Sequence, residues 1–150
     1  MRLVIQRVKE ASVTVDGNKV SAIGRGMMVL VGVEDGDTEA DMEWLAAKTA
    51  GLRIYDDEAG VMNRSITDCG GDVLAVSQFT LTASTRKGNR PSYIRAARHD
   101  VAVPLYEAYC SRVGELTGRE VKKGIFGADM KVSLINDGPV TIIIDSRLKE

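Results

Sequence analysis

The sequence of 150 residues contains a single histidine and only two cysteines, which argues against several kinds of site. His99, Cys69 and Cys110 lie far apart, and no spacing typical of a zinc site joins them. Neither a GxGxxG motif nor a P-loop occurs, so the sequence gives no support for binding of NAD or a nucleoside triphosphate. We therefore predict a protein that uses no metal ion and no other cofactor.

Long apolar runs and a strong excess of either charge are also missing. No stretch approaches the roughly 20 apolar residues that a membrane helix needs, and the apolar run near the N-terminus is too short for a signal peptide. We therefore expect a cytoplasmic protein with no membrane partner and with reduced cysteines. The formal net charge is −1, so any site for nucleic acid should be a local basic patch.

The composition is that of a soluble globular protein, with 44% hydrophobic and 27% charged residues. We expect residues 1–150 to form one domain. Two helices are predicted, the first introduced by a capping pair of Thr38 and Asp41 and the second by Asp100. Alternating or β-branched segments predict strands over residues 3–8, 11–15, 19–23, 27–33, 72–81, 130–134 and 140–144. This pattern indicates an α+β fold, with sheets packed on each other and the helices on one side.

The last two predicted strands flank a corner. Residues 136–139 read Asn-Asp-Gly-Pro, and Pro139 has no N–H group to donate to a central ladder. Considered alone, this corner predicts a loop that closes a hairpin.

Two neighbouring segments carry candidate chemistry. Polar residues and free backbone N–H groups follow a strand at Ser77–Thr80, which is a common way to build an oxyanion site, although the same side chains could simply face solvent. Residues 84–99 then hold no acidic residue and five basic ones, namely Arg86, Lys87, Arg90, Arg95 and Arg98. This composition suits phosphate contacts but also fits a solvated charged loop. His99 is the only imidazole available for a Ser-His-Asp triad, and we disfavour that interpretation.

Taken together, these segments resemble the D-aminoacyl-tRNA deacylases of the bacterial and eukaryotic type. Two motifs carry the resemblance, SQFTL at residues 77–81 and NDGPVT at residues 136–141. Further matches are IQRV at 5–8, RKGNRPS at 86–92 and FGADM at 126–130. The resemblance extends from residue 1 to about residue 144.

The resemblance implies a homodimer with β/β/α layers, mainly antiparallel sheets and two main helices. It implies that the Gly138–Pro139 bond is cis and that this pair enters the active site of the other subunit as a chiral filter, held in place by Arg7. The ester carbonyl would be received by a catalytic segment comprising Ser77, Gln78, Phe79 and Thr80. The terminal adenosine of the tRNA would lie between Phe126 and Met130, and the tRNA phosphates would contact Arg86, Lys87 and Arg90.

The implied activity is hydrolysis of the ester in D-aminoacyl-tRNA, with rejection of the L form. Glycine has no side chain for such a filter to reject, so we expect mischarged glycyl-tRNA to be a substrate too. Either Thr80 attacks the ester, or a water does so with help from the free ribose hydroxyl, and we favour the second route because Thr80 has no evident base nearby. Two other classes stay open at this point, a nucleic-acid-binding module without catalysis and an esterase that uses Ser77 or Thr80 on small molecules.

Overall fold

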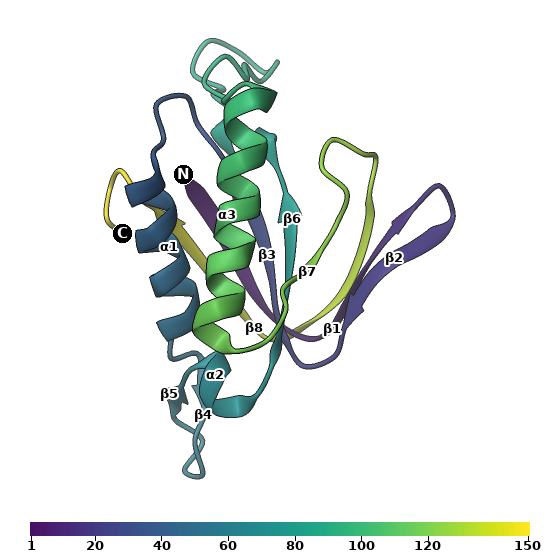
Figure 1. The fold of residues 1–150 in the computed structure, drawn as a ribbon, viewed down its shortest axis with the longest axis vertical. Helices are drawn as coiled ribbons and strands as arrows, with labels where there is room; N and C mark the ends of the chain where they lie inside the picture. Colours follow the sequence, from purple (N-terminus) through teal and green to yellow (C-terminus); the bar gives the residue numbers. More distant parts are fainter.

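The computed structural model describes all residues from 1 to 150 and shows helices packed on a curved sheet (Figure 1). The elements follow the chain in the order β1 (Arg2–Val15), β2 (Asn18–Ile23), β3 (Gly26–Gly32), α1 (Glu39–Gly51), β4 (Tyr55–Asp56), β5 (Met62–Arg64), α2 (Ile66–Cys69), β6 (Asp72–Ser77), a 3₁₀ turn (Phe79–Thr82), α3 (His99–Thr117), β7 (Lys122–Lys123) and β8 (Lys131–Asp145). No helix is long and apolar enough to cross a membrane.

The predicted α+β architecture is confirmed, but the main sheet is mixed. Strand β1 pairs antiparallel with β2, β3 and β8, whereas β3–β6 and β6–β7 are parallel. The reason lies in the connections. Parallel neighbours need a long crossover, usually through a helix. Helix α1 lies in the connection from β3 to β6, and α3 lies in the connection from β6 to β7.

Two apolar clusters fill the two sides of the sheet and produce its layers. The larger cluster lies between the sheet and helices α1 and α3, which pack side by side, and it includes Leu3 and Ile5. The smaller cluster includes Val8, Ala11 and Val13 and lies inside the curve of the sheet, where β2 comes near β6 and β7. Strand β1 contributes side chains to both clusters for two reasons. Successive side chains of a strand point to opposite faces, and the pairing of β1 with β8 is irregular after Gln6 and again after Val8.

The prediction of a C-terminal hairpin is wrong. Residues 131–145 form the single long strand β8, and both of its halves pair with β1 instead of with each other. Gln6 is opposite Thr141 and Val8 is opposite Asn136, so Arg7 alone faces residues 137–140. The Gly-Pro pair therefore lies in this bulge, which we call the 137–140 bulge, and the Gly138–Pro139 peptide bond is cis.

Three smaller expectations are also corrected. Residues 2–15 form one strand because its bulges do not end its pairing with β8, whereas two strands were expected. Strand β6 ends at Ser77, since the chain turns there into the 3₁₀ turn. Helix α3 begins at His99, so Asp100 lies within its first turn, and Arg98 occupies the N-cap position without a side-chain hydrogen bond. The capping pair at the start of α1 is confirmed, because the Thr38 N–H donates to the Asp41 carboxylate at 2.8 Å.

Candidate active site

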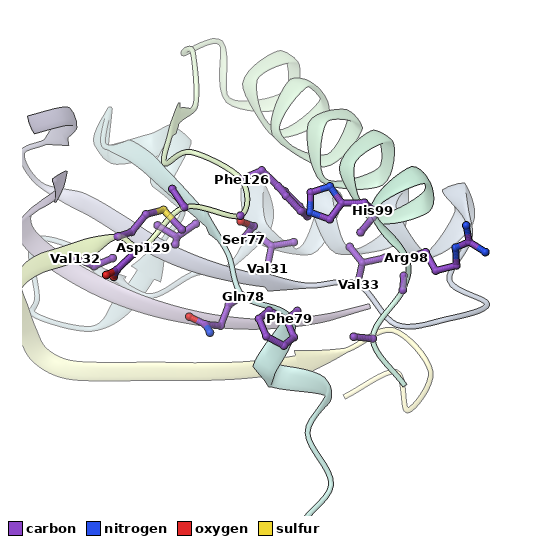
Figure 2. Close-up of a pocket in the computed structure, with 17 residues that line it drawn as sticks. Val31, Val33, Ser77, Gln78, Phe79, Arg98, His99, Phe126, Asp129 and Val132 are labelled. Carbon is purple, nitrogen blue, oxygen red and sulfur yellow. The ribbon is translucent and has the colours of Figure 1, made fainter. Parts of the chain in front are cut away.

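A pocket of about 690 Å³ opens between the end of β6, the start of α3 and the segment that precedes β8 (Figure 2). Eleven of its 17 lining residues are hydrophobic. An apolar pocket with a few polar groups is the usual form of a small-molecule site. The pocket brings together five of the residues that the sequence predicted for the site, namely Ser77, Gln78, Phe79, Phe126 and Met130.

One wall of the pocket is the turn that follows β6. The Gln78 N–H donates to the Val31 carbonyl at 2.8 Å, which fixes the start of the turn to β3. The Gln78 side-chain amide donates to the Thr80 hydroxyl, and the half-buried Thr80 follows Phe79, whose ring is 56% exposed. The N–H groups of Phe79 and Thr80 begin the 3₁₀ turn and find no acceptor within it, as in the first turn of any helix. The turn can therefore supply hydrogen-bond donors to a ligand.

The opposite wall is aromatic. The Phe126 ring meets His99 edge-on at 4.8 Å between ring centroids and Tyr106 at 5.6 Å, and Figure 2 shows His99 beside Phe126. Behind them, the Tyr106 hydroxyl donates to the Ala75 carbonyl at 3.0 Å. Burial raises the pKa of Tyr106, so the hydroxyl keeps its proton for this bond. The wall is thus anchored to β6, the strand that carries the opposite wall.

His99 and Arg98 line the pocket, although the sequence interpretation gave neither a place in it. The only sequence signal for His99 was its position at the end of the basic segment, residues 84–99. His99 makes no hydrogen bond to Ser77 or Thr80 and packs against Phe126 instead, so the structure does not assemble a triad. No three His, Cys, Asp or Glu side chains form a group that could hold a metal ion.

The basic residues Arg86, Lys87 and Arg90 lie outside the pocket on a closed loop. Ser84 and Ser92 exchange backbone hydrogen bonds of 2.9 Å at the base of this loop, and the three basic residues are exposed at its tip. None of the three forms an ion pair, whereas Arg95 pairs with Glu34 at 3.2 Å and Arg98 with Asp100 at 3.5 Å. The Tyr93 ring contacts Phe79 at 5.1 Å between centroids and so joins the loop to the pocket wall.

Gly138 and Pro139 do not line the pocket of their own chain. Both are exposed on β8, which forms no pairing on the side away from β1. Arg7 contacts the bulge, since its Nε donates to the Asp137 carbonyl at 3.0 Å. The predicted residues therefore form two groups on one chain, the pocket with its basic loop and the 137–140 bulge with Arg7.

The chain is similar to known proteins over nearly its whole length. A sequence model described as D-Tyr-tRNA(Tyr) deacylase matches residues 4–145. The chain is 61% identical to a D-aminoacyl-tRNA deacylase of Parabacteroides distasonis and 57% identical to that of Bacteroides thetaiotaomicron, each over the full length of both chains.

Solved structures agree with the sequence matches. One described as c-Myc DNA Unwinding Element Binding Protein superimposes with a TM-score of 0.90 at 40% identity, covering 97% of this chain and 98% of the other. A probable eukaryotic D-amino acid tRNA deacylase shares the fold with a TM-score of 0.81 at 20% identity, covering 95% and 97%. On the match over residues 4–145 and the full-length identities, the chain belongs to the D-Tyr-tRNA(Tyr) deacylase family.

Proposed function

We propose that residues 1–150 form one deacylase domain that hydrolyses the ester of D-aminoacyl-tRNA in the cytoplasm and releases free tRNA and the amino acid. The observation that carries the proposal is the pocket, in which two of the matching segments, at residues 77–79 and 126–130, face each other in a chain of this family. An apolar pocket with donors on one wall suits an aminoacyl ester attached to a nucleoside.

The chemistry follows from the two walls. The terminal adenosine lies between Phe126 and Met130, and the ester carbonyl points at the N–H groups of Phe79 and Thr80. Negative charge develops on that oxygen during attack, and fixed N–H donors stabilise it. Esters of this kind are reactive, so positioning and oxyanion stabilisation suffice without a strong protein base.

The chiral filter is the 137–140 bulge of a second copy of the chain. Gly138 and Pro139 are exposed and lie outside the pocket of their own chain, so they act on a substrate only in a partner's pocket. Strand β8 leaves one edge unpaired, and two of its apolar side chains, Ile135 and Ile143, are 50% and 63% exposed. A free strand edge together with exposed apolar side chains is suited to a symmetric dimer. In that setting the backbone carbonyls of the pair face the substrate amino group. An L side chain would collide with these carbonyls and a D side chain would point away from them. Glycine has no side chain to collide and would be accepted.

The dimer has its own test. Ile143→Glu should yield monomers by analytical ultracentrifugation and lose deacylation, because the charge would be buried at the interface. Leu148→Glu is a matched control, since Leu148 is equally exposed but lies outside β8. A monomeric wild-type protein that still discriminates between D- and L-tyrosine would refute the arrangement.

We favour a water as the nucleophile, assisted by the free ribose hydroxyl. The Thr80 hydroxyl accepts a hydrogen bond from Gln78 and has no imidazole or carboxylate partner that could take its proton. Thr80→Val should therefore retain most of the single-turnover rate. A trapped acyl-threonine, together with loss of nearly all of the rate in Thr80→Val, would show that Thr80 attacks.

The decisive assay is release of tyrosine from D-Tyr-tRNA and L-Tyr-tRNA. We expect the protein to release D-tyrosine and glycine under conditions in which L-Tyr-tRNA decays only at its spontaneous rate. Equal rates for the two enantiomers would refute the chiral filter. Turnover of simple esters without turnover of aminoacyl-tRNA would indicate the small-molecule esterase instead.

A second candidate function is nucleic-acid binding without catalysis. The similar solved structure is described as a DNA-unwinding-element binding protein, and the exposed loop with Arg86, Lys87 and Arg90 suits phosphate contacts. A pure binding module would show salt-dependent affinity for RNA or DNA and no release of the amino acid. The same deacylation assay therefore separates the two functions.

A further inference from the structure

Arg7 connects the 137–140 bulge to a second segment of the chain. Its Nε donates to the Asp137 carbonyl at 3.0 Å, and its Nη1 donates to the Ile54 carbonyl at 2.7 Å. Ile54 precedes the small β4–β5 hairpin, which lies far from β8 in the sequence and outside the main sheet. One guanidinium thus joins two segments that form no backbone ladder with each other.

The charge of Arg7 is balanced from both sides. Its side chain is 11% exposed, with the carboxylate of Asp56 at 3.6 Å from Nη1 and that of Asp137 at 3.7 Å from Nε. A nearly buried guanidinium needs such partners, because an uncompensated buried charge is costly. Asp56 and the Ile54 carbonyl therefore fix the guanidinium on the side away from the bulge.

The bulge depends on this guanidinium for its shape. Ladder pairing stops between Gln6↔Thr141 and Val8↔Asn136, so residues 137–140 have no regular partner on β1. Arg7 Nη2 lies 3.2 Å from the point where a Cβ on Gly138 would be. Movement of the guanidinium would therefore directly change the space beside Gly138.

The hairpin end of this connection is rigid. Ile54 and Tyr55 are 6% and 1% exposed and belong to the larger apolar cluster. Beyond them, the Asp57 carboxylate accepts hydrogen bonds from the N–H groups of Ala59 and Val61, at 2.8 and 3.0 Å, and so closes the hairpin turn. The backbone that carries the Ile54 carbonyl and Asp56 is thereby held by the buried side chains of Ile54 and Tyr55 and by the closed hairpin turn.

The geometry points to Asp56 as a positioning residue that determines stereospecificity. It acts through Arg7 on the backbone of the 137–140 bulge and touches no substrate itself. This inference rests on the proposed function, in which that bulge separates D- from L-aminoacyl esters. Loosening the bulge permits an L side chain to fit, so the D-to-L rate ratio falls while the rate with the D substrate changes less.

The test compares single-turnover rates on D-Tyr-tRNA and L-Tyr-tRNA. Asp56→Asn removes the charge and should lower the D-to-L rate ratio by about two- to fivefold, the effect of losing one partly exposed ion pair. Asp56→Glu should restore the ratio. Arg7→Lys should lower it further, because a lysine ammonium cannot hold both carbonyls in the fixed geometry of a guanidinium.

Glu58→Gln is the matched control. It removes the same charge from the same hairpin, but Glu58 pairs with Arg64 and not with Arg7. We expect it to leave the ratio unchanged. A merely structural role of Asp56 would lower the melting temperature and both rates in proportion, and a constant ratio in Asp56→Asn would overturn the inference. Failure of the wild type to prefer D-Tyr-tRNA would instead refute the proposed function itself.

Discussion

Adding one methyl group at Gly32 should slow deacylation without unfolding the protein. Gly32 ends β3, directly beside the turn that forms the donor wall of the pocket. A Cβ at this position would lie 2.9 Å from the Leu81 Cβ and 3.1 Å from the Gln78 carbonyl oxygen. Both atoms belong to the turn or are attached rigidly to it, so neither can move away by a simple side-chain rotation.

The size of the expected effect follows from these distances. Carbon atoms in contact prefer about 3.5–4.0 Å, so a contact of 2.9 Å must lengthen by about 0.6–1.1 Å. The turn rather than β3 should move, because β3 is paired with neighbours on both sides. A displacement of about 1 Å of catalytic groups can cost on the order of a hundredfold in rate. Overpacking of this kind should cost about 1–3 kcal/mol in stability.

The assay is single-turnover deacylation of D-Tyr-tRNA, accompanied by a thermal melt. Gly24→Ala is the matched control, since a Cβ on Gly24 meets nothing within 4 Å and its backbone angle is ordinary. We expect Gly32→Ala to remain folded and to lose between about tenfold and a hundredfold of its rate, while Gly24→Ala keeps full activity. A Gly32→Ala protein with the wild-type rate would show that the turn at residues 78–81 does not position the reacting groups.

Three further predictions concern folding, pH and tRNA binding. Gly26→Ala should abolish soluble folded protein, because its Cβ would lie 1.8 Å from the Asp72 carbonyl oxygen in the β3–β6 ladder, and circular dichroism against the same control variant checks this. Burial works to raise the pKa of Asp41, but hydrogen bonds from Thr38 outweigh it and bring the pKa to about 2. Asp41→Ala should therefore lower the melting temperature above pH 4, and the difference should vanish as the pH falls through 2. Arg86→Ala should weaken tRNA binding and reduce the slope of log affinity against log salt by about one.

Local signals predicted most of the secondary structure. The Thr38–Asp41 cap and the alternation in β1 depend on neighbouring residues only, and both are confirmed. The parallel pairings were missed, although a buried strand followed by a helix and a second strand is the usual sign of a parallel crossover. His99 was missed as a pocket residue because its contact with Phe126 joins two distant segments and has no local signature.

The C-terminal segment shows where local reasoning must fail. Gly138 and Pro139 interrupt a strand pattern, and the rules of turns then favour a hairpin. Nothing local indicates that a third segment, β1, pairs with both halves of the segment and leaves a bulge between them. The difference between a hairpin and a bulge has a physical consequence. A hairpin tip is held from one side only, whereas the 137–140 bulge is held by ladder pairing before and after it and by the hydrogen bond from Arg7. A device that discriminates by backbone collision needs such stiffness, since a flexible tip would yield to the wrong enantiomer. A bulge within a long paired strand therefore suits stereochemical selection better than the hairpin that the sequence favoured.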